Sequence, residues 1–206
     1  MKLPVLIAAR NEAEHIGNTL RALDYSQVEP IVIDDGSQDA TARIVQDNFP
    51  GVTLLQLEGW QGKMPALQTA IEHLGRRATE PFATLDADTR PIFSKHWSTA
   101  LLRARATCDQ ERPAVIVGSS IYVDHAAVTM AAYRTISEIR LQAKGRRDPD
   151  SRGWFGRNTL IHLQNSAAVN RVLELPNYWP REDVALKDAA VRDREAVIGE
   201  VYKTPD

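Results

Sequence analysis

The sequence predicts an α/β fold in which a mostly parallel sheet carries helices on both faces. Short apolar runs alternate with segments of helical spacing through the first half of the chain, an alternation typical of parallel strands joined by crossover helices. Acidic residues directly follow two of these runs, at 34–35 and at 86–88. The 206 residues suffice for one complete core, so we expect a single domain over 1–206.

Four strands and three helices are expected in the first half. The strands are apolar runs dominated by β-branched and aliphatic residues, at 3–8, 31–33, 52–57 and 82–85. A capping residue and acids at 11–14 suit a helix start, and helical spacing continues through Ile16, Leu20 and Leu23. Helical patterns also cover 39–49, which Pro50 and Gly51 end, and 64–74.

The second half has a weaker pattern. Residues 115–123 are expected as a strand and 126–144 as a long helix, followed by a charged loop over 144–157. The segments 159–163 and 167–172 fit either a strand or a helix, and 182–191 has helical character.

Composition and charge exclude several classes of protein. Apolar residues make up 43% and charged residues 25%, which is ordinary for a globular protein, and the net charge of -2 gives no basic field for a nucleic-acid partner. No apolar run approaches the roughly 20 residues of a membrane span, and no leader is recognised. With a single cysteine, Cys108, we expect a cytoplasmic protein with at most peripheral contact at the inner face of a membrane.

Acidic side chains stand where the second and fourth expected strands end. Ligands of open parallel sheets bind beyond the carboxyl ends of the strands, so 34–35 and 86–88 are expected on one rim. In an extended chain Asp86 and Asp88 point the same way; a turn would instead let one carboxylate meet a metal and the other a sugar or phosphate oxygen. Mg²⁺ and Mn²⁺ favour such oxygen ligands. The alternative is a solvated acidic turn.

Three further segments have both a functional and a structural interpretation. Ser37 or Asp39 would cap the next helix as readily as the 34–39 segment would bind a ligand. Lys63 would balance phosphate charge, although a surface lysine is the simpler interpretation. Backbone groups at 8–12 would hold a base edge, and capping by Asn11 explains part of that segment equally well.

Taken in order, these segments resemble family 2 glycosyltransferases of the GT-A fold. The matching segments are Ile7-Ala8-Ala9-Arg10-Asn11-Glu12, the stretch 32–41, Gly62-Lys63 with Ala66-Leu67, the stretch 85–91, and Arg181-Glu182-Asp183-Val184-Ala185-Leu186, which is similar to the family's Glu-Asp motif. The resemblance covers about residues 3 to 190. The Gln-x-x-Arg-Trp motif and membrane helices of processive members are missing, so transfer of a single sugar is expected.

The resemblance implies a binding role for residues in the first half, 1–90, as the nucleotide-binding half. Ala8 falls at a backbone contact to the nucleoside, and Asp35 matches the acid that contacts the base, usually uracil. Asp86 matches the acid that meets the ribose or the sugar. Further substrate-binding residues expected beside the donor are Arg10, Glu12, Lys63 and Glu182.

The resemblance also implies the chemistry. Asp88, the second acid of the Asp-x-Asp motif, matches the ligand of Mn²⁺ or Mg²⁺, and Asp183 matches the catalytic base in the acceptor-side half, 91–206. We expect direct displacement with inversion, from a nucleotide-sugar donor (a UDP-sugar) to an unknown glycan or lipid-linked acceptor.

Two other functions compete with this one. A nucleotidyltransferase would be expected to open with a glycine-rich loop, but residues 8–11 contain no glycine. A non-catalytic nucleotide-sugar-binding module would not need both Asp88 and Asp183. The basic stretch 134–157, which includes Trp154, is either a loop that closes over phosphate or a solvated charged surface.

Overall fold

The computed structural model describes residues 1–89, 102, 114–117, 158–163, 165–177 and 197–200. Its strands are β1 (Leu3–Ala9), β2 (Val28–Asp34), β3 (Thr53–Gln56), β4 (Phe82–Leu85), β5 (Ala114–Val117), β6 (Asn158–Ile161) and β7 (Val197–Glu200). Its helices are α1 (Ile16–Arg21), α2 (Thr41–Asn48), α3 (Lys63–Leu74), the 3-10 helix η1 (Gly75–Thr79) and α6 (Ser166–Leu173).

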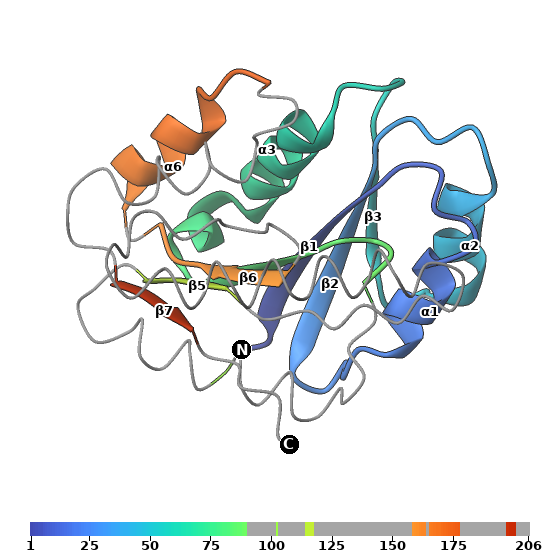
Figure 1. Ribbon diagram of the computed structural model, residues 1–206, viewed down its shortest axis with the longest axis horizontal. Helices are drawn as coiled ribbons and strands as arrows, with labels where there is room; N and C mark the ends of the chain where they lie inside the picture. Colours follow the sequence, from blue (N-terminus) through green and yellow to red (C-terminus); the bar gives the residue numbers. More distant parts are fainter. Residues whose placement is uncertain (90–101, 103–113, 118–157, 164, 178–196, 201–206) are drawn as a thin grey trace, which may run out of the picture.

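The strands form one sheet in the order β3-β2-β1-β4-β6-β5-β7 (Figure 1). Strands β1 to β4 are parallel, and β6 runs antiparallel to both β4 and β5. The chain leaves β1 for β2 and β3 on one side, and it returns to β4 on the other side. The carboxyl ends of β1 and β4 therefore flank a topological switch point, where ligands of such sheets bind.

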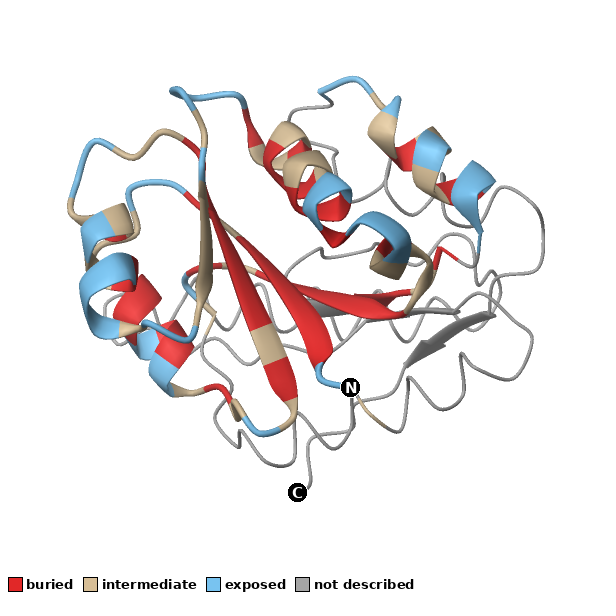
Figure 2. Cartoon of the chain, turned by 180° about the vertical axis from the view of Figure 1, so that it is seen from behind, coloured by how far each residue is buried: buried red, intermediate tan, exposed pale blue. Residues whose placement is uncertain are grey.

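Helices cover the sheet on both faces (Figures 1 and 2). In β1, Leu3, Val5 and Ile7 pack into one core cluster with side chains of α1 and α2, whereas Leu6 packs into the other cluster with α3 and α6. Because successive strand residues face opposite sides, burial on both faces requires an uninterrupted apolar run. The strand therefore presents apolar side chains to each helical layer, as its sequence requires.

Gln68 attaches α6 to α3. Its Nε2 donates to the carbonyl oxygens of Val172 at 2.9 Å, Leu173 at 3.2 Å and Leu175 at 2.8 Å. These carbonyls lie at the end of α6, where a helix has no partners of its own for its last C=O groups. The amide thereby fixes the end of α6 and the segment that leaves it.

The expected parallel sheet with helices on both faces is confirmed, and most elements of the first half lie within a few residues of their predicted bounds. Strand β2 starts earlier than predicted and contains Pro30, which is tolerated because β3 pairs only from Ile31 onward. Of the two ambiguous segments, the first is strand β6 and the second is helix α6. Strand β7 was not predicted.

The helix expected from Asn11 begins five residues later, at Ile16. Asn11 has a φ of 53°, in the left-handed region, which a helix start does not allow. The expected strand over 115–123 is described only within 114–117, and the expected elements at 126–144, 144–157 and 182–191 lie outside the described residues. No helix in the described part of the chain is long and apolar enough to span a membrane.

Candidate functional site

Four loops meet at the carboxyl edge of the sheet, one after each of β1 to β4. The loops after β2 and β3 continue the hydrogen bonding between neighbouring strands past the strand ends. The Asp35 N–H donates to the Ala9 carbonyl and the Leu57 N–H donates to the Asp34 carbonyl, both at 2.9 Å. The loops after β1, β2 and β3 are therefore held side by side above the sheet.

Asp35 is buried at this edge next to the buried Asp34, with 3% of its surface exposed. Its Oδ1 accepts from the Gln61 N–H at 2.7 Å, and its Oδ2 accepts from the Gly62 N–H at 2.8 Å. Hydrogen bonds of an ionised carboxylate to backbone N–H groups are about twice as strong as neutral ones. Asp35 thus fixes the β3–α3 loop immediately before Lys63, and one further acceptor site remains on each oxygen.

Gly36 lets the β3–α3 loop approach closely. A Cβ atom at this position would lie 2.3 Å from the Gly59 carbonyl carbon and 2.7 Å from the Trp60 nitrogen. Gly36 also has a φ of 66°, which side-chain-bearing residues rarely adopt. Both the backbone conformation and the contact require glycine here.

The loops after β1 and β2 are connected by four backbone-to-side-chain hydrogen bonds, one of which runs from the Gln38 N–H to Asn11 Oδ1 at 2.8 Å. Consecutive N–H groups after β1 donate to Ser37 Oγ (from Asn11, 3.0 Å), Thr41 Oγ1 (from Glu12, 2.8 Å) and Asp39 Oδ2 (from Ala13, 3.1 Å). Asp39 also accepts from the Thr41 N–H at 2.9 Å, at the first residue of α2. Asp39 thus binds the first N–H of α2 from the residue before the cap, whereas the cap itself is Ala40, with no side-chain hydrogen bond. Asn11 serves a loop-to-loop contact rather than a helix cap.

Lys63 and Asp86 form an ion pair between the start of α3 and the end of β4. The Lys63 Nζ lies 2.5 Å from Asp86 Oδ1, and the side chains are 27% and 22% exposed. Partial burial reduces screening by solvent, so this pair fixes both side chains more firmly than an exposed pair would. A cation therefore lies beside the first acid of the Asp-x-Asp motif.

The segment 86–89 is a turn, closed by a 3.0 Å hydrogen bond from the Thr89 N–H to the Asp86 carbonyl. Ala87 is buried, and its carbonyl accepts from Thr19 Oγ1 of α1 at 2.6 Å. Because Ala87 is anchored, Asp86 is held against Lys63 while Asp88 is exposed. The turn gives Asp86 and Asp88 different surroundings. This is the outcome expected for a turn at this segment, and not for an extended chain.

Glu12 brings a further carboxylate toward the same acids. Burial raises the pKa of Glu12 above its ordinary value, and the negative charges of Asp88, Asp39 and Asp86 raise this pKa further, while His15 opposes the shift. The edge of the sheet near β1 and β4 is therefore a region of negative potential, suited to a cation.

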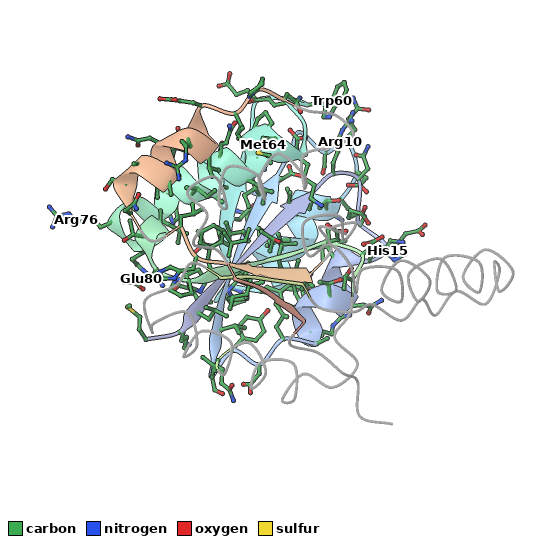
Figure 3. The ribbon with its side chains drawn as sticks, turned by 60° about the vertical axis from the view of Figure 1, so that its left-hand side comes forward. Arg10, His15, Trp60, Met64, Arg76 and Glu80 are labelled. Atoms are coloured by element: carbon green, nitrogen blue, oxygen red, sulfur yellow. The ribbon has the colours of Figure 1, made fainter. Side chains whose placement is uncertain are left out.

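Arg10 and Trp60 lie next to each other at this edge, in the loops after β1 and β3 (Figure 3). The Arg10 guanidinium carbon lies 4.8 Å from the centroid of the Trp60 ring, within cation–π distance. Trp60 is nevertheless 62% exposed. The loops after β1 and β3 thus present an aromatic side chain beside a cation.

The structure brings most of the predicted site residues to one edge. Ala8 is half-buried near the end of β1, and the loop residues predicted to bind substrate or metal follow the strands β1 to β4, namely Arg10, Glu12, Asp35, Lys63, Asp86 and Asp88. Glu182 and Asp183 lie outside the described residues, as does the basic stretch 134–157. Within the described ranges, no group of three or more His, Cys, Asp or Glu could hold a metal, and His162 belongs to none.

Several residues of this edge were not recognised in the sequence. Thr19 acts on a loop far away in the chain, and Trp60 was not considered. Gly36 belongs to the matching stretch 32–41, but its contact with the β3–α3 loop was not expected. Asn177 was also missed: its Nδ2 donates to the Gln61 carbonyl at 2.7 Å. The sequence offered one sign that the backbone around Trp60 is constrained, namely the glycines on either side of it in Gly59-Trp60-Gln61-Gly62.

Comparisons with known proteins agree with this geometry. A family model described as Glycosyl transferase family 2 matches residues 5–162. A 4,4'-diaponeurosporenoate glycosyltransferase of Staphylococcus aureus is 36% identical over 93 residues, which cover 42% of this chain and 24% of that protein. The chain thus spans about a quarter of the length of the curated relatives it matches.

Solved structures show the same fold. A mannosyltransferase from Pyrobaculum calidifontis, in complex with GDP-Man and Mn²⁺, superposes with a TM-score of 0.64 and 19% identity, over 97% of this chain and 55% of that chain. A glucosyl-3-phosphoglycerate synthase from Mycobacterium tuberculosis, in complex with Mn²⁺, UDP and glucosyl-3-phosphoglycerate, superposes with a TM-score of 0.57 and 16% identity, over 99% and 73%. The expected GT-A fold is confirmed.

Replacing Gly36 tests the contact between the loops after β2 and β3. We expect Gly36→Ala to lower the free energy of unfolding by about 2 kcal/mol or more, because the new methyl group meets backbone and the φ is unfavourable. Gly51→Ala is the control, since nothing lies within 4 Å of its added Cβ. Chemical denaturation measures both, and equal stability of the two variants would contradict the assigned contact.

The raised pKa of Glu12 predicts a pH-dependent stability. The folded state holds the Glu12 proton more tightly than the unfolded state, so protonated Glu12 stabilises the protein at low pH. This stabilisation is lost as the pH rises from the ordinary pKa of a glutamate through the raised pKa of Glu12. We expect Glu12→Gln to be more stable than wild type at pH 7 and to lose part of the pH dependence. Thermal unfolding between pH 4 and pH 8, in metal-free buffer, measures this, and unchanged pH dependence would refute it.

Proposed function

Because the chain belongs to glycosyl transferase family 2, we propose that it transfers a sugar from a nucleoside-diphosphate donor to an acceptor hydroxyl, with inversion at the anomeric carbon. The donor is proposed to be a UDP-sugar, and transfer is proposed to be non-processive. The acceptor is proposed to be a glycan or a lipid-linked molecule.

One observation carries this proposal: Lys63, Asp86 and Asp88 come together at the switch point of the sheet. The ion pair holds a cation at the start of α3, and Asp88 presents an exposed carboxylate on the neighbouring turn. A diphosphate needs positive charge, from Lys63 and from a metal ion that a carboxylate holds. The arrangement supports binding of the charged part of a nucleotide sugar at this point.

The residues present fit a divalent cation. Mg²⁺ is commonly held by one or two carboxylates together with substrate phosphates and water, so a site with a single exposed carboxylate, Asp88, suits an ion completed by the donor. When bound, Mn²⁺ or Mg²⁺ would neutralise the negative charge that develops on the departing diphosphate. The negative potential around Glu12 and Asp86 favours the cation further.

The remaining roles are proposed for side and main chains of this protein. Ala8, through its backbone, and Asp35 position the nucleoside, and Asp86 contacts the ribose or the sugar. Asp183, with Glu182 beside it, takes the proton of the acceptor hydroxyl as its oxygen bonds to the anomeric carbon and the bond to the diphosphate breaks. Displacement from the face opposite the leaving group inverts the configuration.

Metal-dependent nucleotide binding tests this function. Calorimetric titration with UDP, GDP and dTDP, with and without Mn²⁺, should show binding of one nucleotide that depends on the metal. Asp88→Asn should abolish the metal dependence and reduce hydrolysis of UDP-glucose about 100-fold or more, whereas Asp47→Asn, an exposed acid on α2, should not. Full activity of Asp88→Asn would refute the metal assignment.

The proposed base is tested separately. Asp183→Asn should bind the nucleotide as tightly as wild type but lose sugar transfer and hydrolysis, because the amide cannot accept the proton. Titration and a hydrolysis assay of the same preparation distinguish these effects. If Asp183→Asn instead weakens nucleotide binding, Asp183 belongs to the donor site and not to the acceptor side.

A further inference from the structure

The Arg10–Trp60 pair is not accounted for by the roles proposed above. Trp60 is one of two large hydrophobic residues that are mostly exposed in the described part of the chain, and the other is Met1 at the terminus. A single exposed hydrophobic residue is ordinary on a protein surface, but this indole is stacked under a guanidinium and stands on a loop that Asp35 holds by two hydrogen bonds. Trp60 at the carboxyl edge of the sheet, where ligands of open parallel sheets bind, is therefore a candidate contact surface.

The loop that carries Trp60 is held on three sides. Asp35 accepts from the two backbone N–H groups that follow Trp60, and Gly36 packs directly beneath its backbone nitrogen. Asn177 donates to the Gln61 carbonyl from the α6 side. A side chain on a loop with these contacts loses little further conformational freedom when it binds a ligand, so its position is pre-organised for contact.

Arg10 leaves part of the indole uncovered. The guanidinium stands over the ring at 4.8 Å, yet 62% of the residue stays exposed. A guanidinium stacked on an aromatic ring orients it and adds a positive charge beside the contact surface. The pair therefore presents a fixed aromatic face next to a cation, a combination that recognises a nucleobase attached to phosphate.

The order of the strands in the sheet indicates which part of a bound donor would lie next to the Arg10–Trp60 pair. Lys63, Asp86 and Asp88 lie at the ends of α3 and β4, on one side of β1, whereas β3, which precedes the Trp60 loop, lies on the other side beyond β2. A nucleoside diphosphate whose phosphates lie at the β4 side extends its base toward the β2–β3 side. The base then arrives beside Asp35 and Trp60.

We propose that Trp60, oriented by Arg10, is the stacking surface for the nucleobase of the donor. This inference rests on the proposed function, because it assumes that a nucleoside diphosphate occupies the site. Stacking tolerates different bases, since every base has a π-face. Trp60 thus contributes affinity for the nucleoside, and the polar groups of the β1 and β2 loops distinguish one base from another.

The experiment compares ligands with and without a base. Wild type, Trp60→Ala and Trp60→Phe are titrated in the presence of Mn²⁺ with UDP, GDP, dTDP and inorganic pyrophosphate. Trp60→Ala should weaken binding of the nucleoside diphosphate about 10- to 100-fold and leave pyrophosphate binding unchanged. Trp60→Phe, which keeps a flat aromatic face, should retain most of the affinity, and unfolding temperatures establish that both variants are folded.

The contrary results are distinct. If wild type binds a nucleoside diphosphate and Trp60→Ala binds it equally well, or loses pyrophosphate affinity to the same extent, Trp60 does not stack on the base. If Trp60→Ala instead keeps nucleotide affinity but loses binding to vesicles of equal phosphatidylcholine and phosphatidylglycerol, the indole is a membrane contact and the inference is wrong. If folded wild type binds no nucleoside diphosphate, the proposed function itself fails, and the stacking role fails with it.

Discussion

The buried carboxylate of Asp35 is the constraint on which the geometry of this edge depends. A carboxylate with 3% exposure must find partners in the protein, and it finds them in the N–H groups of Gln61 and Gly62. Those bonds set where the loop enters α3, and so they set where Lys63 begins that helix. The ion pair with Asp86, which needs Lys63 within reach of the end of β4, follows from the same anchoring.

Charge is distributed unevenly along this edge. Asp86 and Asp88 follow β4, Lys63 pairs with Asp86, and the charges of both acids raise the pKa of Glu12, while Arg10 stacks over Trp60 in the loops after β1 and β3. An acidic end and an aromatic, cationic end match a ligand with a charged, metal-binding part and a planar part. The loops of β2 and β3 are separated from the loop of β4 because β2 and β3 lie on one side of β1 and β4 lies on the other.

Much of the sheet was predictable because strands buried on both faces leave uninterrupted apolar runs, and the acids after β2 and β4 mark its carboxyl edge. The start of α1 was not predictable, since Asn11 is held by a hydrogen bond between its side chain and the Gln38 N–H, 27 residues away. The sequence named residues that the structure brings to one edge, but it did not indicate how they are arranged there. Local sequence does not show that Lys63 pairs with Asp86, or that Gly36 lies against Gly59. The proposed base, Asp183, lies outside the described residues.

The close approach of Gly36 to the Gly59-Trp60 backbone also limits how the protein can be redesigned. A loop transplanted between β3 and α3 from another member of the family must cross the same point without a Cβ beneath it, and it must place two N–H groups on the Asp35 carboxylate. Loop exchange is therefore compatible with changes in the identity of residue 60, but not with changes in loop length between residues 59 and 62. Substitutions intended to change what this edge binds are therefore restricted to a few positions around residue 60.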